Sequence, residues 1–162
     1  MTKFIILRGC ENTGKTTTCN YVYKQLLKSA NTEHLFGWPE VSLTMVTKDS
    51  RGYDKKGLPV DIKTVMIIGN KKVGILSRGD IVEPAFTNSI NEVLSQNVDI
   101  FLCCTRSKNR NNSTYAYIEE ISKGYPQEVF WTNVTEIAEK VDTIKRKQAE
   151  EIAEYILDEL KK

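Results

Sequence analysis

One short stretch near the amino terminus restricts the possible folds of this chain more than any other feature. Residues 9–16 read Gly-Cys-Glu-Asn-Thr-Gly-Lys-Thr, in which two glycines enclose four residues and a lysine and a threonine follow. An apolar run of strand length, residues 4–7, comes before it. After it, apolar side chains recur at the spacing of one helix face, namely Cys19, Val22, Tyr23, Leu26 and Leu27. The pattern predicts a tight turn between a buried strand and a helix.

Elementary chemistry makes this turn suitable for binding an anion. Gly9 and Gly14 let the backbone turn and approach an anion without a side chain in the way. The amides that follow then point inward, at the positive end of the helix dipole. These amides belong to Asn12, Thr13, Gly14, Lys15, Thr16 and Thr17. The turn is therefore suited to holding a phosphate chain.

These eight residues match the pattern G-x-x-x-x-G-K-[ST], and the chain here resembles the P-loop NTPases. The resemblance is carried by residues 1–28 and is diffuse beyond them. It implies a nucleoside triphosphate, ATP or another, bound together with Mg²⁺. Lys15 would reach the β- and γ-phosphates, Thr16 would ligate the Mg²⁺ and Thr17 would meet the α-phosphate.

Length and composition agree with one soluble domain. The chain has 162 residues, of which 40% are hydrophobic and 27% charged, as is ordinary for a soluble protein. A net charge of +2 gives no signal for a nucleic-acid partner. No apolar run approaches the ~20 residues of a membrane helix, and no signal peptide is visible before the first strand. We expect a cytoplasmic protein with no membrane partner.

The four cysteines, Cys10, Cys19, Cys103 and Cys104, do not have the spacing of metal ligands. His34 is the only histidine, so the sequence does not indicate a zinc site. Cys103 and Cys104 are adjacent in an apolar run, where their side chains would face opposite sides of a strand. We expect buried, reduced thiols of a cytosolic protein.

The segment that follows the first helix is polar. We expect the helix to end near residue 29 or 30, and a loop over residues 31–39, where a glycine and a proline break regular structure. Residues 41–46 are rich in β-formers and predict a strand. Residues 47–59 predict a basic loop, which is either a solvated surface segment or a loop whose cations meet a second phosphate or carboxylate.

Two β-rich runs, residues 64–68 and 73–76, are joined by a short Gly/Asn connection that predicts a hairpin. We expect residues 73–76 to form a core strand beside the first strand. P-loop enzymes usually place a carboxylate at the end of such a strand, where it holds Mg²⁺ through water. Asp80 is the nearest candidate, ahead of Asp49. Asp80 is equally suited to cap the helix that begins at Ile81.

A second helix is predicted over residues 81–96, and a near-continuous apolar run over residues 99–104 predicts a buried parallel strand. The following loop, residues 105–113, leaves the carboxyl end of that strand, which is the edge where α/β sheets bind ligands. Arg106 and Arg110 in this loop could bind the phosphates of a nucleoside triphosphate or stack on its base. The alternative is a basic surface loop.

The last third of the chain predicts two helices and one strand. A helix begins at residue 113 or 114 and ends before Gly124, and a short strand covers residues 128–132. A long helical pattern over residues 136–160 would dock on the sheet or mediate self-association. No repeat or linker divides residues 1–162 into domains.

Strands that alternate with helices predict a three-layer α/β/α sandwich, with a mainly parallel sheet and one antiparallel hairpin. The resemblance implies that this is the P-loop NTPase fold. The loop sequence is similar to those of nucleoside and nucleotide kinases, in which an acidic residue often precedes Gly-Lys-Thr-Thr. This implies ATP- and Mg²⁺-dependent transfer of the γ-phosphoryl to a small, nucleoside- or nucleotide-like acceptor. Lys15, Arg106 and Arg110 would meet the transferred group.

Two alternatives stay open. The first is a hydrolytic switch, because the hairpin over residues 64–76 resembles the second and third strands of small GTPases. That family's Asp-x-x-Gly and Asn-Lys-x-Asp would fall near residues 77–80 and 105–108, where Ser-Arg-Gly-Asp and Thr-Arg-Ser-Lys stand instead. The second is a nucleotide-binding protein without catalysis, which is a partner in a larger assembly.

Overall fold

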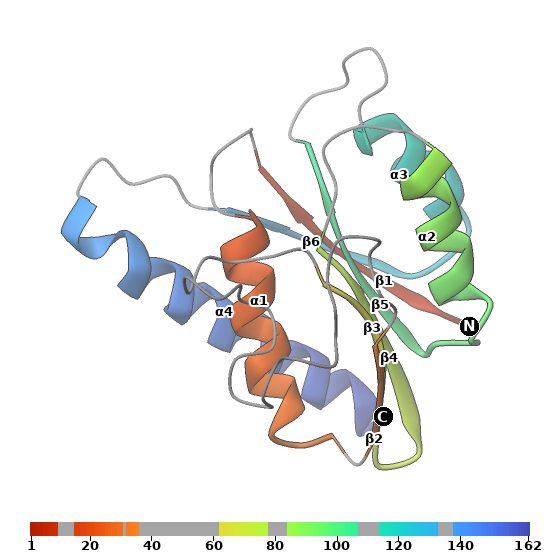
Figure 1. Cartoon of the computed structure of the whole chain (residues 1–162), viewed down its shortest axis with the longest axis horizontal. Coiled ribbons are helices and arrows are strands. Elements are labelled where there is room, and N and C mark those ends of the chain that lie inside the picture. The colour runs from red at the N-terminus through yellow and green to blue at the C-terminus, as the bar shows by residue number, and fades with distance from the viewer. Residues whose placement is uncertain (10–14, 31, 36–61, 78–83, 107–113, 133–137) are drawn as a thin grey trace.

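In the computed structural model, the described part of the chain contains six strands, which form one mixed sheet (Figure 1). The structure describes residues 1–9, 15–30, 32–35, 62–77, 84–106, 114–132 and 138–162, with the side chains of residues 15, 16, 32–35 and 138–142 outside this description. The strands are β1 (Lys3–Arg8), β2 (Thr32–Leu35), β3 (Lys63–Ile68), β4 (Lys71–Leu76), β5 (Ile100–Thr105) and β6 (Gln127–Trp131). The helices are α1 (Lys15–Leu27), α2 (Pro84–Leu94), α3 (Thr114–Ser122) and α4 (Ala138–Leu160).

Four strands run parallel, in the spatial order β4, β5, β1, β6. The buried parallel strand predicted over residues 99–104 is confirmed as β5. Because β5 lies between β4 and β1, the prediction that residues 73–76 lie beside the first strand is wrong. All six residues of β5 are buried, so this strand takes a central place with a parallel neighbour on each side.

The other half of the sheet is antiparallel. β3 and β4 form the predicted hairpin around Gly69 and Asn70, and Gly69 has a φ of 63°, which favours glycine. β2 adds a second antiparallel pair on β3, whereas the sequence predicted a loop over residues 31–39. The four residues of β2 have no apolar alternation of their own, and pairing with β3 makes them a strand. The strand predicted over residues 41–46, the loop over residues 47–59 and Asp49 lie outside the described residues.

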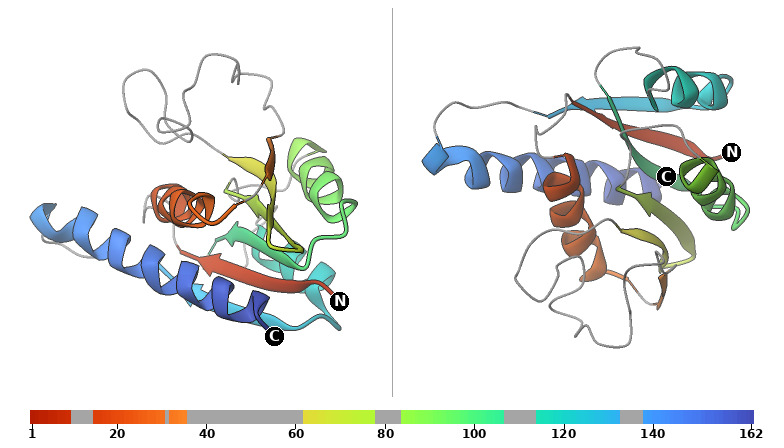
Figure 2. Two further views of the ribbon diagram at one scale, coloured as in Figure 1. Left: turned by 90° about the horizontal axis from the view of Figure 1, so that it is seen from below. Right: turned by 45° about the horizontal axis from the view of Figure 1, so that its top comes forward.

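Helices cover both faces of the sheet, which gives the three predicted layers (Figure 2). α1 and α4 pack against each other on one face, and α2 and α3 lie on the other. Cys104 is buried in the first of these two cores and Cys103 in the second. The prediction that the adjacent cysteines are buried thiols on opposite sides of a strand is therefore confirmed.

The helices begin and end close to the predicted residues. α2 falls inside the range predicted over residues 81–96, and α3 begins at Thr114. Gly124 follows α3 with a φ of 80°, as the predicted helix end requires. Among the described residues, no helix combines the length and the apolar character needed to cross a membrane.

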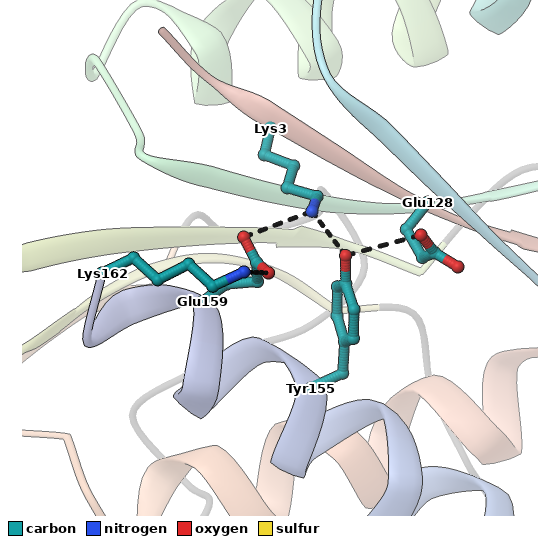
Figure 3. Close-up of polar contacts among 5 residues, drawn as sticks. All are labelled: Lys3, Glu128, Tyr155, Glu159 and Lys162. Atoms are coloured by element: carbon teal, nitrogen blue, oxygen red, sulfur yellow. Dashed lines mark hydrogen bonds and ion pairs between the residues drawn. The ribbon is translucent and has the colours of Figure 1, made fainter.

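The last turns of α4 are fastened to the amino end of β1 (Figure 3). Lys3 Nζ donates a hydrogen bond to the Tyr155 hydroxyl and lies 3.2 Å from Glu159 Oε2. The Tyr155 hydroxyl donates to Glu128 Oε2 on β6 at 3.5 Å, and Lys162 Nζ lies 2.7 Å from Glu159 Oε1. The apolar face of α4 packs on the sheet and on α1 through Ala149, Ile152, Ala153 and Ile156. The predicted docking of this helix is therefore confirmed.

Candidate functional site

Three parallel strands end side by side at one edge of the sheet. In the pairing register, Arg8 at the end of β1 lies opposite Thr105 of β5 and Trp131 of β6. Backbone hydrogen bonds continue past the strand ends. The Gly9 N–H donates to the Thr105 carbonyl at 3.2 Å, and the Thr132 N–H donates to the Arg8 carbonyl at 2.8 Å. This carboxyl edge is therefore fixed by hydrogen bonds up to Gly9.

The glycine pattern connects this edge to α1. β1 ends at Arg8 and α1 begins at Lys15, so the predicted strand and helix on either side of the pattern are confirmed, and the turn between them stays a prediction. Thr17 lies half-buried in the first turn of α1. Lys15 and Thr16 are the first two residues of α1, with side chains outside the description, and Asn12, Thr13 and Gly14 lie outside the described residues altogether.

The first turn of α1 has the electrostatic character of an anion site. The first four N–H groups of a helix have no partner within the helix, and the helix dipole places about +0.5 charge there. The first turn of α1 contains no acidic side chain to offset that charge. An anion at the end of β1 would therefore be stabilised by the helix, and no acidic side chain of the first turn of α1 would oppose it.

Arg106 comes from the strand directly beside β1. Its N–H donates to the Thr114 hydroxyl at 3.0 Å, which ties the end of β5 to the first residue of α3. The buried Thr105 hydroxyl donates to the Arg106 carbonyl at 3.1 Å. These bonds place Arg106 one strand away from Gly9, at the edge where the sequence predicted it. Arg110 lies outside the described residues.

The resemblance led us to expect a carboxylate at the end of the strand beside the turn. That strand is β5, and it ends in Cys103, Cys104 and Thr105, none of which is acidic. Asp80 follows β4, which β5 separates from β1, and it lies outside the described residues. No group of three or more His, Cys, Asp or Glu residues that could hold a metal ion occurs in the described ranges. The described residues therefore do not complete a Mg²⁺ site, and Thr16 and Asp80 stay predictions.

Arg8 is a buried cation that the sequence patterns did not indicate. Its Nη2 lies 3.3 Å from Glu119 Oε1, and its guanidinium carbon lies 4.2 Å from the centre of the Tyr115 ring, both on α3. Its Nε is buried without a hydrogen-bond partner among the described residues. Arg8 thus holds α3 against the strand that precedes the turn. The sequence feature that could have indicated this role is an arginine at the end of an apolar run.

The cysteine next to Arg8 is not a reactive thiolate. Burial raises the pKa of the Cys103 thiol well above its ordinary value, Cys104 adds to this, and the Arg8 cation acts in the opposite direction. A buried thiol with a raised pKa stays protonated and unreactive. We therefore assign Cys103 to the core and not to the chemistry of this edge.

Trp131 was also missed, because residues 128–132 predicted a short strand and nothing more. It lies opposite Arg8 at the same edge, and its exposed fraction is 51%. The signal that was present is an aromatic residue at the end of a strand, followed by Thr-Asn.

Comparisons of the chain with protein-family models, with curated proteins and with solved structures found no match in any of the three. The chemistry of this edge is therefore inferred from its own residues.

Proposed function

We propose that this protein is an ATP- and Mg²⁺-dependent kinase of the P-loop NTPase fold, which transfers a γ-phosphoryl group to a small nucleoside- or nucleotide-like acceptor. One observation carries most of the proposal. The glycine pattern of residues 9–14 lies between β1, which has a parallel neighbour on each side, and a helix whose first turn has no acidic residue. A turn in that place brings backbone amides toward an anion above the sheet edge.

The proposed roles follow from charge and position. Lys15 and the amides of residues 12–17 would hold the phosphates, and Arg106, on the neighbouring strand, would meet the transferred phosphoryl. Arg110 belongs to the same loop and would act with it. Such transfer relies on positioning and charge neutralisation more than on covalent chemistry at the protein. Mg²⁺, with Thr16 as its proposed ligand, would add charge neutralisation on the phosphates.

The place of β5 favours phosphoryl transfer over the hydrolytic switch. The switch interpretation uses the β3–β4 hairpin as the second and third strands, with β4 beside β1. β5 separates β4 from β1, so the hairpin does not border the strand that carries the turn. The strand that borders β1 on this side is β5. It ends next to Arg106, whose guanidinium is suited to binding a phosphoryl group.

The test is ADP release from ATP–Mg²⁺ in the presence of a panel of nucleosides and nucleoside monophosphates. Release that requires one class of acceptor, and is lost in Lys15→Ala, is the expected result. Lys28→Ala is the matched control, because Lys28 is an exposed lysine just beyond the other end of α1. Release without any acceptor would favour the hydrolytic switch instead. Tight binding without turnover would favour the non-catalytic partner, and no binding of ATP or GTP would refute the site.

A further inference from the structure

Trp131 is an exposed aromatic at the end of an otherwise well-packed sheet edge. Its exposed fraction is 51%, although tryptophan is among the residues that gain most from burial. The other large apolar side chains exposed in the described ranges are Met1 and Tyr125. The Tyr125 ring packs against Phe4 with ring centres 5.5 Å apart. In contrast, the Trp131 ring makes no aromatic or cation–π contact within the described part of the chain.

The backbone at Trp131 is held in place although its ring is exposed. Gln148, a buried residue of α4, donates from Nε2 to the Trp131 carbonyl. The next residue, Thr132, donates to the Arg8 carbonyl from its N–H at 2.8 Å and from its hydroxyl at 3.2 Å. Adjacent strands lie ~4.8 Å apart, so the backbone of Trp131 stands about that far from the residue that precedes Gly9. The backbone that carries the indole is therefore held in a fixed position beside the carboxyl end of β1.

We infer that Trp131 is the surface on which the base of the bound nucleotide stacks. This inference rests on the proposed triphosphate site. A triphosphate held after Gly9 would extend its nucleoside along the carboxyl edge, either toward β5 and Arg106 or toward β6. On the β6 side stands an indole that is half-exposed and has no ring partner among the described residues. Aromatic faces are good platforms for a nucleobase, because every base has a π-face.

The two sides of the carboxyl edge would then bind different parts of the substrates. The β5 side, with Arg106, would receive the transferred phosphoryl and its acceptor, and the β6 side would receive the base. Stacking is tolerant of base identity, because it reads no hydrogen-bond pattern. The contact would therefore strengthen binding of ATP and GTP alike and would not by itself select one of them.

Comparing two ligands distinguishes the contribution of the base to binding from the contribution of the phosphates. ATP–Mg²⁺ carries both, and inorganic tripolyphosphate with Mg²⁺ carries no nucleoside. Trp131→Ala should weaken ATP binding roughly 5- to 150-fold in isothermal titration, the effect of removing one base–aromatic stack, and leave tripolyphosphate affinity unchanged. Trp131→Phe should retain most of the ATP affinity. Tyr125→Ala, an exposed aromatic just before β6 at its other end, is the matched control and should change neither affinity.

Fluorescence gives an independent readout. The chain has two tryptophans, Trp38 and Trp131, so Trp38→Phe leaves Trp131 as the only indole. ATP–Mg²⁺ should then shift or quench its emission, and tripolyphosphate should not. An identical response to both ligands would contradict stacking. Thermal unfolding of each variant checks that the fold is retained.

The other possible results of these binding experiments lead to different conclusions. Equal weakening of both ligands by Trp131→Ala, or weakening of neither, would overturn the inference and leave the triphosphate site standing. Failure of both ligands to bind the unaltered protein would refute the proposed function, and the inference with it. Dissociation of an oligomer by Trp131→Ala, without selective loss of ATP, would place the ring in a subunit interface and would also overturn the inference.

Discussion

The two ends of β1 use their polar groups in different ways. At the amino end, Lys3, Tyr155 and Glu159 bind one another, and the cluster joins β1 to α4 and β6 (Figure 3). At the carboxyl end, β1 leads into the glycine pattern of residues 9–14, with Arg106 just after one neighbouring strand and the half-exposed Trp131 at the end of the other. The polar groups at the amino end bind one another, whereas Arg106 and Trp131 at the carboxyl end stand at the ends of two strands on either side of β1.

The difference shows that a polar cluster does not by itself indicate a functional site. The amino-end cluster includes two ion pairs and a tyrosine. Its contacts through Lys3 and Tyr155 fasten the last helix to the sheet, and the Lys162–Glu159 pair lies within the end of that helix. The hydrogen bond to Tyr155 raises the pKa of Lys3 above its ordinary value of 10.5, which keeps Lys3 charged and paired. We therefore expect variants at the amino end to change stability and variants at the carboxyl end to change ligand binding.

The largest expected effect is on stability, at the helix that the amino-end cluster fastens. Ile156→Ala removes a fully buried side chain of α4, and it should lower the free energy of unfolding by about 2–5 kcal/mol, because it deletes apolar contacts and leaves a cavity. Urea unfolding measures the loss. Glu154→Ala, at an exposed position on the same helix, is the control. Triphosphate affinity at a temperature where both variants are folded should not change, and a change would show that the two ends are coupled.

The next effect is on binding, at the carboxyl end. Lys15→Ala should weaken triphosphate binding by about 1.5–3 kcal/mol, roughly 10- to 150-fold in Kd, as expected for a lost charge-assisted hydrogen bond. Isothermal titration gives the affinity, and urea unfolding should show little change in stability. An unaltered affinity would remove the turn from the proposed site.

A smaller effect on stability is expected at Lys3. Lys3→Met keeps the apolar stem but removes the ion pair with Glu159 and the hydrogen bond to Tyr155, and it should lower the free energy of unfolding by about 0.5–1.5 kcal/mol. ATP affinity should stay as it was. A loss of ATP affinity greater than the loss of stability would mean that the amino-end cluster serves the site after all.

The smallest expected effect is a pH dependence of the same cluster. Hydrogen bonds from Lys162 and then Lys3 lower the pKa of Glu159 below its ordinary value of 4.5. The stability contributed by Glu159 is therefore fully present above about pH 4.5 and is lost as the pH falls through the lower native pKa. Urea unfolding should find Glu159→Gln less stable than the unaltered protein at pH 7, with the gap closing in acid. A gap that is constant with pH would contradict the assigned ion pairs.

Local pattern predicted the elements of the fold better than their arrangement. The first strand and the first helix, the hairpin around Gly69 and the apolar strand that ends at Thr105 all have clear sequence patterns, and all are present. The order of strands is set by packing across the sheet and not by their order in the chain. The prediction that β4 lies beside β1 was therefore wrong. β2 was missed because its hydrogen bonds to β3, and not its own residues, make it a strand.

The candidate site shows the same limit. The glycine turn and Arg106 were predicted because a motif and a strand end mark them in the sequence. Arg8 and Trp131 were not predicted as site residues, because each ends an apolar run and its position indicates only a strand. Their significance depends on the register that sets β5 and β6 on either side of β1, and register is a property of the assembled sheet.

The most direct test of the central claim is a crystal structure with adenylyl imidodiphosphate and magnesium. The polyphosphate should lie in the turn of residues 9–14, with the backbone amides of α1's first turn directed at it. A turn that stays empty at saturating analogue, or that is filled by the protein's own side chains, would contradict the account.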